Sequence, residues 1–488
     1  MPTNAATLNY RSARELAAAL EAREFSAVEL LEHTIARIER HDDAVNAVPV
    51  RDFERARVAA AAADAALAGG ERGPLLGIPM TAKESYNVAG LPTTWGFPAF
   101  KDWRATEDAV AVARLKAAGA VFAGKTNVPV GLGDWQSYNE VYGTTNNPWH
   151  MGRSPGGSSG GSAASLAAGY VSLEIGSDIG GSLRAPAHFC GVFSHKPSYG
   201  LLPGRGHAFP GTDGPPADLA AIGPLARSAG DLALALEILA RPDDADAVGY
   251  RLALPPPRHN RIADFRVLVL DEHPDFPTSS SVRAALQRVA DALANEGTPV
   301  ARSSPLVPDL ARAARVFSSL LFASMSARWP ADLIARIQAA SAALARDDES
   351  LHAYRLRGAV LTHGAWLALD AQRARQRAQW RELFGTFDAV ICPAMPTPAF
   401  PHDHTADFDA RTLDVDGTAR PYANQVVWAG VPTSPGLPAT TVPIERDPSG
   451  LPVGVQIIGP HLEDRTPIAL AGVLEHIFGG FTPPPGFA

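Results

Sequence analysis

Cysteine is almost absent: the 488 residues include only two, Cys190 and Cys392. Two thiols cannot form a disulfide framework or a four-ligand zinc site, so proteins built on either device are excluded. We therefore predict no metal site. We expect each cysteine to be a small buried side chain.

Long hydrophobic runs are also missing. No stretch of 18 or more apolar residues suggests a segment that spans a membrane. The first residues, "MPTNAATLNYRSARELAAALE", lack the basic region and the apolar region of a signal peptide. These absences predict a cytoplasmic protein that has no membrane partner.

An excess of positive charge is the third missing feature. Lys and Arg number 43 against 51 Asp and Glu, and the net charge of −8 gives no support for a nucleic-acid partner. Apolar residues make up 46% of the chain and charged residues 19%, which is the balance of a folded protein. The length has room for roughly two to four average domains or for one large α/β domain.

Helical and strand-like patterns alternate along the first half of the chain. Ser12 and Ser26 are placed as N-caps of two amphipathic helices, and an Ala-rich helix is predicted near residues 53–68. Strand-like runs such as "LLGIPMTAK" and "AVFAGKT" lie between helical stretches. This alternation predicts a sheet with helices on its faces.

A Pro-rich connection at residues 255–257 separates a second half. There "FRVLVLDE" is strand-like, and long helices are predicted over roughly 308–384. The stretches "FDAVICPA", "LPATTVPIE" and "VGVQIIG" predict late strands that return to the sheet, the last two joined by the turn "RDPSG".

Residues 119–126, "GAVFAGKT", match the phosphate-loop pattern G-x-x-x-x-G-K-[ST]. That motif requires a strand before it, an open loop in its middle and a helix after it. Here a helix precedes, the middle is strand-like and Pro129 follows. The context favours a buried strand that ends at Lys125 and Thr126.

The most unusual stretch is "SPGGSSGGSAA" at residues 154–164. It is compatible with four interpretations: a flexible linker, a phosphate-binding loop, the start of a helix, or a loop that carries a catalytic serine. It matches G-x-S-x-G twice, the nucleophile elbow of α/β-hydrolases. An elbow needs a preceding strand and a downstream acid and histidine. The preceding residues are unlike a strand, and candidates such as Asp213 and His259 are not singled out by any local pattern.

A third constellation accounts for more residues. Ser182, in "GSDIGGSLRAPAHFCG", is a second glycine-flanked serine 24 positions after Ser158, and Lys83 ends an apolar run. Glycines let successive N–H groups face one point, as an oxyanion hole requires. A lysine that emerges from buried surroundings can have its pKa lowered enough to act as a base.

These segments together resemble the amidase signature family. The resemblance rests on "GRSPGGSSGGSAASLAAG" and "GSDIGGSLRAPAHFCGVFSHKPSYG", and it extends to "AKESYNVAGLPTTWG", "YGTTNNPW", "FDAVICPAMPTP" and "GLPVGVQIIGP". It covers most of the chain and is weakest over about 240–385.

The resemblance implies an α/β fold, one large α/β/α domain around a mixed, twisted sheet that spans 1–488. Within it we expect N-terminal helices (1–70), a signature core (71–240), a more variable helical region (about 241–385) and C-terminal strands with a helix (386–488).

The resemblance also implies a Ser–cis-Ser–Lys triad. Ser182 matches the nucleophile, Lys83 the general base, and Ser158 the bridging serine, whose peptide bond from Gly157 would be cis. The matching oxyanion-hole groups are the backbone N–H groups of Ile179, Gly180, Gly181 and Ser182. The matching supporting residues are Ser177, Asp178 and Arg184.

Six side chains are candidates for the substrate pocket: Trp135, Gln136, Tyr138, Ser159, Phe209 and Trp428. Aromatic residues dominate cores as well as pockets, so core packing stays open for the tryptophans. His188 and His195 have no role in a lysine mechanism and are expected to be structural.

The implied function is a cofactor-independent amidase that cleaves neutral apolar or aryl linear amides through an acyl-enzyme, and also esters or carbamates. Its expected partner is a small amide substrate, with a homodimer left open. Glu84 stands where the family often has Asp. Residues 217–224, "ADLAAIGP", differ from the glutamyl-tRNA amidotransferase subunits, which weakens that alternative. A catalytically silent binding protein is the other alternative.

Overall fold

Eleven strands drawn from both halves of the chain form one mixed sheet in the computed structural model, which describes residues 8–212 and 217–487. The strand order is β1-β3-β2-β6-β8-β7-β14-β15-β11-β9-β10. Their bounds are β1 Val50–Arg51, β2 Pro79–Lys83, β3 Val121–Thr126, β6 Leu173–Asp178, β7 Phe193–Lys196, β8 Ala221–Ala226, β9 Val267–Val269, β10 Val300–Ala301, β11 Ala389–Pro393, β14 Ala439–Arg446 and β15 Pro452–Ile458.

Both strand directions occur in this sheet. β2 runs parallel to β3 and β6, and β9 runs parallel to β10 and β11. The pairs β6–β8, β7–β8, β7–β14, β14–β15 and β11–β15 are antiparallel. The prediction of a mixed sheet is therefore confirmed. Two small hairpins stand apart from it: β4 Tyr138–Asn139 with β5 Gly143–Thr144, and β12 Thr412–Val415 with β13 Thr418–Pro421.

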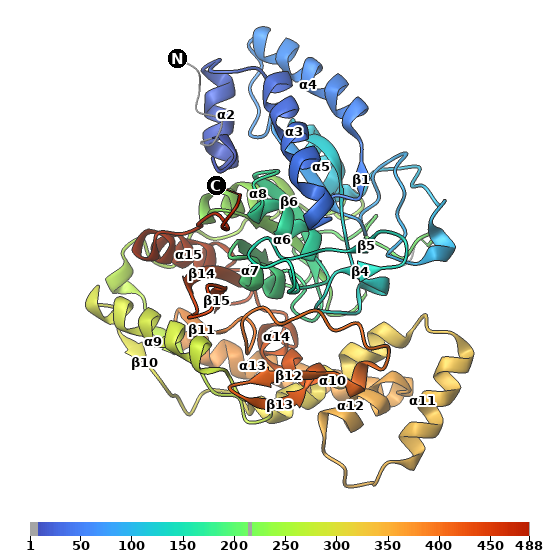
Figure 1. Cartoon of the computed structure of the whole chain (residues 1–488). Helices are drawn as coiled ribbons and strands as arrows, with labels where there is room; N and C mark the ends of the chain where they lie inside the picture. Colours follow the sequence, from blue (N-terminus) through green and yellow to red (C-terminus); the bar gives the residue numbers. More distant parts are fainter. Residues whose placement is uncertain (1–7, 213–216, 488) are drawn as a thin grey trace.

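Helices cover the sheet and extend beyond it (Figure 1). Their bounds are α2 Ala13–Glu21, α3 Ala27–Val45, α4 Phe53–Ala68, α5 Val110–Ala117, α6 Gly160–Ala167, α7 Arg184–Cys190, α8 Ala229–Leu239, α9 Ser280–Asn295, α10 Leu310–Ser326, α11 Ala331–Ala343, α12 Leu351–Ala359, α13 His363–Thr386, α14 Val427–Thr433 and α15 Arg465–Phe478. The predicted caps are confirmed, because Ser12 and Ser26 each form a capping box with the glutamate three residues on.

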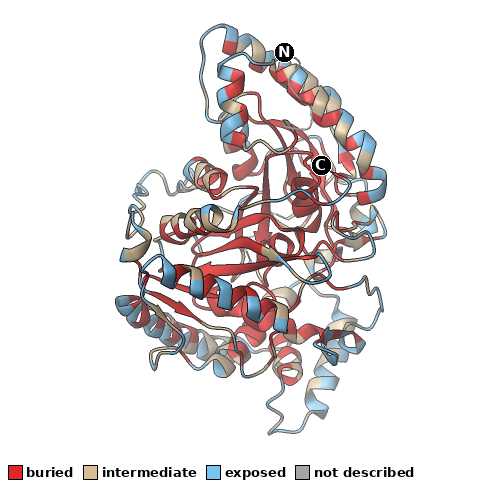
Figure 2. Cartoon of the chain, turned by 60° about the vertical axis from the view of Figure 1, so that its left-hand side comes forward, coloured by how far each residue is buried: buried red, intermediate tan, exposed pale blue. Residues whose placement is uncertain are grey.

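Two groups of helices pack on the sheet. α6 and α7 pack on each other and on central strands, while α5, α8 and α15 form a second packed group with strands of the same sheet. Figure 2 shows buried residues filling the sheet and one side of many of the covering helices. Strands buried on both faces read as continuous apolar runs, which is why the sequence predicts them. The α/β/α expectation is confirmed.

The helices of the variable region gather at one end of the molecule. α10 packs against α12, α13 and α14, and α11 packs against α12. α11 has no buried residue and projects away from the sheet (Figure 1).

The phosphate-loop match at residues 119–126 has the wrong surroundings for a nucleotide site. Its middle lies in β3, every residue of which is buried. Lys125 donates to Thr93 Oγ1 at 2.8 Å and to the carbonyl oxygen of Pro92. The prediction of a buried strand is confirmed.

Two features are absent from the described part of the chain. No helix among residues 8–212 and 217–487 is long and apolar enough to cross a membrane. In the same residues, no group of three or more His, Cys, Asp or Glu side chains is placed to hold a metal ion.

Candidate active site

The ends of two parallel strands place the candidate residues. β2 ends at Lys83, and its parallel neighbour β6 ends at Asp178. The carboxyl ends of parallel strands meet at one edge of a sheet, which is where α/β proteins build binding sites. Ser182 follows β6 by one short turn, and α7 begins at Arg184.

Lys83 is fully buried and contacts two serines. Its Nζ lies 2.7 Å from Ser158 Oγ and 2.9 Å from Ser177 Oγ. No ion pair of the described residues involves Lys83. Burial lowers the pKa of Lys83 to about 7, although the nearby negative charge of Asp178 opposes the shift. A large fraction of Lys83 is therefore neutral near pH 7 and able to accept a proton.

Close packing explains the small residues of the serine loop. The peptide bond between Gly157 and Ser158 is cis, as the resemblance implies. A Cβ at Gly157 would lie 2.3 Å from the carbonyl oxygen of Asp134, and one at Gly161 would lie 2.4 Å from the backbone nitrogen of Asn127. Any larger residue at these two glycines would clash with backbone, so the loop is glycine-rich for packing reasons as well.

Asp178 organises the turn that carries Ser182. Its carboxylate accepts the N–H groups of Gly181 and Leu183 at 2.9 and 3.0 Å. Arg184 pairs with both carboxylate oxygens. Burial alone would raise the pKa of Asp178, but Arg184 and these bonds outweigh it and lower the pKa to about 2.

The four predicted oxyanion-hole donors are not equivalent. The Gly181 N–H is already directed at Asp178, which makes it the least available of the four. Within the described residues, the N–H groups of Ile179, Gly180 and Ser182 have no protein acceptor. Gly181 has φ +97°, a conformation that favours glycine.

Ser159 joins the serine loop to the nucleophile turn. Its N–H donates to the carbonyl oxygen of Ser182 at 3.2 Å, and its hydroxyl donates to the carbonyl oxygen of Ser177 at 3.3 Å. The structure thus brings Lys83, Ser158 and Ser177 into direct contact, and it ties Ser182 to Ser158 through the neighbouring Ser159.

Arg184 connects this turn to the C-terminal part of the chain. Its guanidinium donates to Gln456 Oε1, to Thr433 Oγ1 and to the carbonyl oxygen of Ala429. All of its nitrogens are in use, so Arg184 is not available to a substrate carboxylate.

Trp135 borders the oxyanion turn. Its indole N–H donates to the carbonyl oxygen of Gly180 at 2.9 Å. Trp135 and Ile179 pack against an apolar cluster built mainly on α10, whose half-buried members include Phe322, Met325 and Trp366. Sequence reasoning missed these three residues, because they lie in the region where the resemblance is weakest.

Gln136 and Tyr138 are engaged by the loop at residues 401–411. Gln136 Nε2 donates to the carbonyl oxygen of Asp403, and Gln136 Oε1 accepts the Asp403 N–H. Gln136 has no exposed surface. The Tyr138 ring stacks on His404 with centroids 3.8 Å apart. Gln136, a predicted pocket residue, therefore uses its amide to hold this loop.

Trp428 also has a core position. It is fully buried, its indole N–H donates to Thr278 Oγ1 at 3.2 Å, and its ring packs edge-on against His273. Of the two alternatives for Trp428, pocket wall and packing, the structure has packing.

Phe209 lies in a different aromatic group, on the side of Lys83. Its ring contacts Trp95, Phe97 and Phe100, with centroids 5.8, 5.6 and 5.1 Å away. His207, from the same loop, bonds Ser85 Oγ at 2.9 Å. Trp95 lies within the quoted segment "AKESYNVAGLPTTWG", but no sequence argument gave a role to Trp95 or to His207.

The histidine-based alternative has no support in this geometry. No strand leads into Ser158, and His259 faces Asp388 at 3.3 Å, in the C-terminal half. Asp213 lies outside the described residues. His188 and His195 are buried and bonded to protein groups, as expected of structural histidines.

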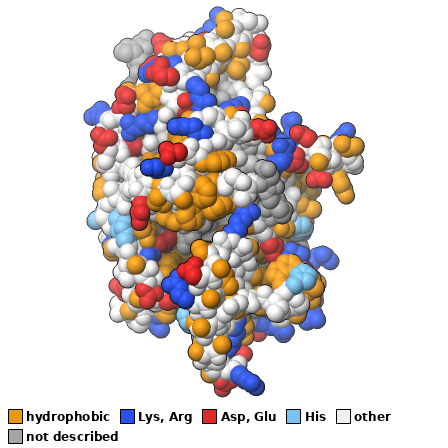
Figure 3. Space-filling model, turned by 90° about the vertical axis from the view of Figure 1, so that its right-hand side faces the viewer, with side chains coloured by type: hydrophobic (Ala, Val, Ile, Leu, Met, Phe, Trp, Pro, Cys, Tyr) orange, Lys and Arg blue, Asp and Glu red, His pale blue; other side chains and the backbone are white. Residues whose placement is uncertain are grey.

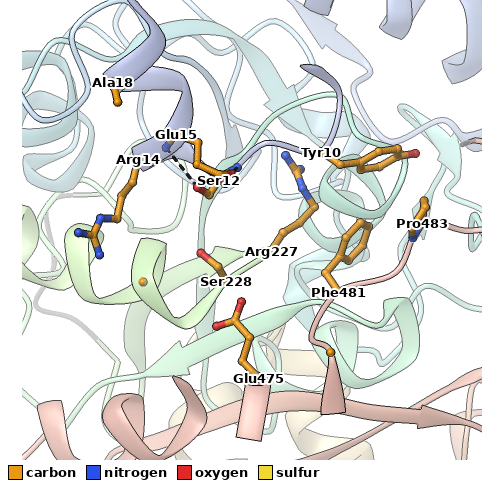
Figure 4. Close-up of a pocket in the computed structure, with 12 residues that line it drawn as sticks. Tyr10, Ser12, Arg14, Glu15, Ala18, Arg227, Ser228, Glu475, Phe481 and Pro483 are labelled. Atoms are coloured by element: carbon orange, nitrogen blue, oxygen red, sulfur yellow. Dashed lines mark hydrogen bonds between the residues drawn. The ribbon is translucent and has the colours of Figure 1, made fainter. Parts of the chain in front are cut away.

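A cavity of about 740 Å³ lies elsewhere, between α2 and the C-terminal end of α15 (Figure 4). Tyr10, Arg227 and Phe481 are among its lining residues, and it contains none of the predicted site residues.

Comparisons with known proteins agree with this arrangement. The family model described as Amidase matches residues 29–467. An indoleacetamide hydrolase of Bradyrhizobium diazoefficiens is 33% identical over 95% of this chain and 87% of its own length.

A glutamyl-tRNA(Gln) amidotransferase subunit from Deinococcus radiodurans is 32% identical over 96% of this chain and 97% of its own. Among solved structures, one described as a vestigial protein complex that reveals the origins of an s-triazine catabolic enzyme is 30% identical. It covers 96% of this chain and 99% of that chain, with a TM-score of 0.81.

Proposed function

The chain belongs to the amidase family, and from this membership we propose that it is a cofactor-independent serine amidohydrolase with Ser182, Ser158 and Lys83 as its triad. The proposed substrates are neutral amides with apolar or aryl groups, and esters or carbamates as secondary substrates. The observation that carries the proposal is the buried contact between Lys83 Nζ and Ser158 Oγ at 2.7 Å.

The proposed first step forms an acyl-enzyme. Ser182 Oγ attacks the carbonyl carbon, its proton passes to Ser158, and the Ser158 proton passes to neutral Lys83. The oxygen of the tetrahedral intermediate accepts the N–H groups of Ile179, Gly180 and Ser182, which have no other protein acceptor within the described residues.

Collapse of this intermediate returns the proton. Lys83 gives it through Ser158 to the substrate nitrogen, the C–N bond breaks and the amine leaves. Water then attacks the ester of Ser182 by the same relay, which releases the carboxylic acid and restores the three residues.

The acyl side favours a neutral, apolar group. Trp135 borders the oxyanion turn, and the Ile179 side chain within that turn is apolar. The donors of Arg184 all bond protein groups. A higher kcat/KM for malonamate-like anions than for neutral anilides would contradict this assignment.

The amidotransferase alternative rests on the similarity to the Deinococcus radiodurans protein, which is one chain of a larger enzyme. An assay of the purified chain alone on an anilide distinguishes the two functions. Hydrolysis without partners or a glutamine donor supports an independent amidase. Labelling by a fluorophosphonate distinguishes an active serine hydrolase from a catalytically silent binding protein, which would not react.

We also propose that 1–488 form one amidase domain, because strands from residue 50 to residue 458 share one sheet.

A further inference from the structure

Two apolar groups border segments that carry the proposed triad. One packs on the oxyanion turn and is built on α10, with Met325 among its half-buried members. The other lies beyond Lys83 and is formed by Trp95, Phe97 and Phe209. A substrate amide also has two sides, the acyl group and the amine.

The chemistry assigns the two sides. The carbonyl oxygen must face the N–H groups of the turn at residues 179–182. The leaving nitrogen must receive its proton from the Lys83–Ser158 relay. The substituent on that nitrogen therefore extends toward the residues that adjoin Lys83.

Ser85, which is close to Lys83 in the chain, contacts residues of the aromatic group. Ser85 is two residues after Lys83, and its carbonyl oxygen accepts the Trp95 indole N–H at 3.2 Å. Ser85 Oγ forms a hydrogen bond with His207 Nε2 at 2.9 Å. The Trp95 ring contacts both His207 and Phe209, with centroids 5.6 and 5.8 Å away.

Trp95 is held rigidly. It has φ +52°, a conformation uncommon outside glycine and characteristic of functional segments. The Glu84 carboxylate accepts the N–H groups of Thr94 and Trp95 at 2.6 and 3.0 Å, which fixes this turn. The indole ring is thus fixed against Ser85, two residues after the proposed base.

The aromatic group reaches the surface. Its rings are only half-buried, and the Arg328 guanidinium, just after α10, lies 5.7 Å from the centroid of Phe209. The end of α10 and the Phe209 loop therefore meet. The side of the molecule that carries α11 faces the viewer in Figure 3, where hydrophobic side chains gather at the centre of the surface.

The group carries no charge of its own. Burial and the neighbouring Lys83 lower the pKa of His207 to about 3, so its imidazole is neutral near pH 7. The Glu84 carboxylate is occupied by backbone N–H groups and by the Tyr142 hydroxyl. A neutral aromatic ring suits this environment better than a charged or strongly polar amine.

We propose that Trp95, Phe97 and Phe209 form the subsite for the leaving amine, and that the preferred leaving group is an aryl amine. This inference rests on the proposed function. It assigns Phe209, a predicted substrate-pocket residue, to the amine side of that pocket.

The test compares benzanilide with benzamide, which share an acyl group and differ only in the amine. In Phe209→Ala, the ratio of kcat/KM for benzanilide to that for benzamide should fall about tenfold, because a ring contact is lost. Phe209→Leu, which keeps an apolar side chain and guards against misfolding, should lower the ratio by a smaller factor.

Leu321→Ala is the matched control on the acyl side, because the Leu321 side chain lies beside Gly180 of the oxyanion turn. It should change kcat/KM for both substrates by the same factor and keep the ratio within about twofold. An unchanged ratio in Phe209→Ala, or a changed ratio in Leu321→Ala, overturns the assignment of the two sides.

Binding separates a failure of this inference from a failure of the proposed function. If the unaltered chain hydrolyses neither amide, the proposed function is wrong, and the subsite is tested by the affinities of both amides for the Ser182→Ala protein. Tighter binding of benzanilide that is lost on adding Phe209→Ala supports the subsite. Equal affinities with and without the Phe209 ring refute it.

Discussion

Lys83 Nζ lies 2.7 Å from Ser158 Oγ, and the two residues are 0% and 1% exposed. A buried ammonium normally requires a carboxylate, but Lys83 hydrogen-bonds two hydroxyl groups, and the nearby Asp178 carboxylate pairs with Arg184. Such surroundings favour the neutral amine, which is the form that a general base requires.

The first prediction concerns pH. Only neutral Lys83 accepts a proton, so kcat/KM for an amide should rise as pH increases through the lowered pKa of about 7 and then level off. Measurement of kcat/KM from pH 5 to 11 tests this. If the rise in kcat/KM instead has its midpoint near the ordinary pKa of lysine, about 10.4, burial does not activate Lys83.

A matched variant sharpens the test. Lys83→Arg keeps the positive charge and similar length but cannot lose its proton near neutral pH, so it should be inactive across the whole range. An active arginine variant would show that residue 83 is not the base.

The second prediction identifies the nucleophile. If Ser182 attacks the carbonyl, a fluorophosphonate should form an adduct on the peptide that contains Ser182. Mass spectrometry of the labelled chain, with Ser182→Ala as the control, decides the point. A label on Ser158 or Ser159 would reverse the assignment.

Much of the fold could be predicted because its signals are local. Buried strands such as β3 and β15 consist of nearly continuous apolar residues. Ser12 and Ser26 indicate helix starts because a serine hydroxyl can accept a backbone N–H of the first turn. The residues of the proposed triad lie in short motifs, so the resemblance could carry them over one by one.

The pocket walls could not be predicted in the same way. Gln136 bonds the backbone of Asp403, 267 residues away, and Met325 approaches Gly133 from a separate helix. Nothing in a local pattern shows which distant segments meet. The sequence likewise does not show that Gln136 and Trp428, both predicted for the pocket, are fully buried.

The third prediction concerns Asp178→Asn, which removes one partner of a fully buried ion pair and leaves Arg184 unpaired. Such losses cost about 3–5 kcal/mol, so the free energy of unfolding should fall by about that amount. Urea unfolding of the variant beside the unaltered chain measures it. A change below about 1 kcal/mol would show that the pair contributes little.

The pH dependence of the same pair has a definite sign. The folded pKa of Asp178, about 2, is below its ordinary value of 3.8, so its stabilisation is present above about pH 4. That contribution, about 2 kcal/mol, is lost as pH falls from 4 to 2. The Asn variant should lack this part of the acid sensitivity.

The fourth prediction concerns Glu174 in β6. Burial raises its pKa to about 8, against the hydrogen bonds that Thr81 and Ser162 donate. Because the folded pKa is raised, the unfolded chain loses its proton first, and the stability contributed by this group falls between about pH 4.5 and 8.

Glu174→Gln removes that loss. The variant should match the original chain near pH 4.5 and exceed it in free energy of unfolding by a few kcal/mol at pH 8. Thermal unfolding of both proteins across this range tests it. A constant difference at all pH values would mean that Glu174 is ionised in the folded protein.

The last prediction follows from leaving-group chemistry. An amide nitrogen must be protonated as the tetrahedral intermediate collapses, whereas an ester oxygen leaves with less help. Lys83 therefore acts twice on an amide, first taking the Ser182 proton through Ser158 and then returning it. Lys83→Ala should depress amide hydrolysis by more than the roughly 10²–10⁴-fold typical of a lost general base, and ester hydrolysis by a smaller factor. Ser158→Ala should fall between, because water replaces part of its relay. The measurement is kcat/KM for a matched amide and ester in each variant. A fully active Lys83→Ala protein would take Lys83 out of the mechanism, and equal losses on the two substrates would remove its role in protonating the leaving nitrogen.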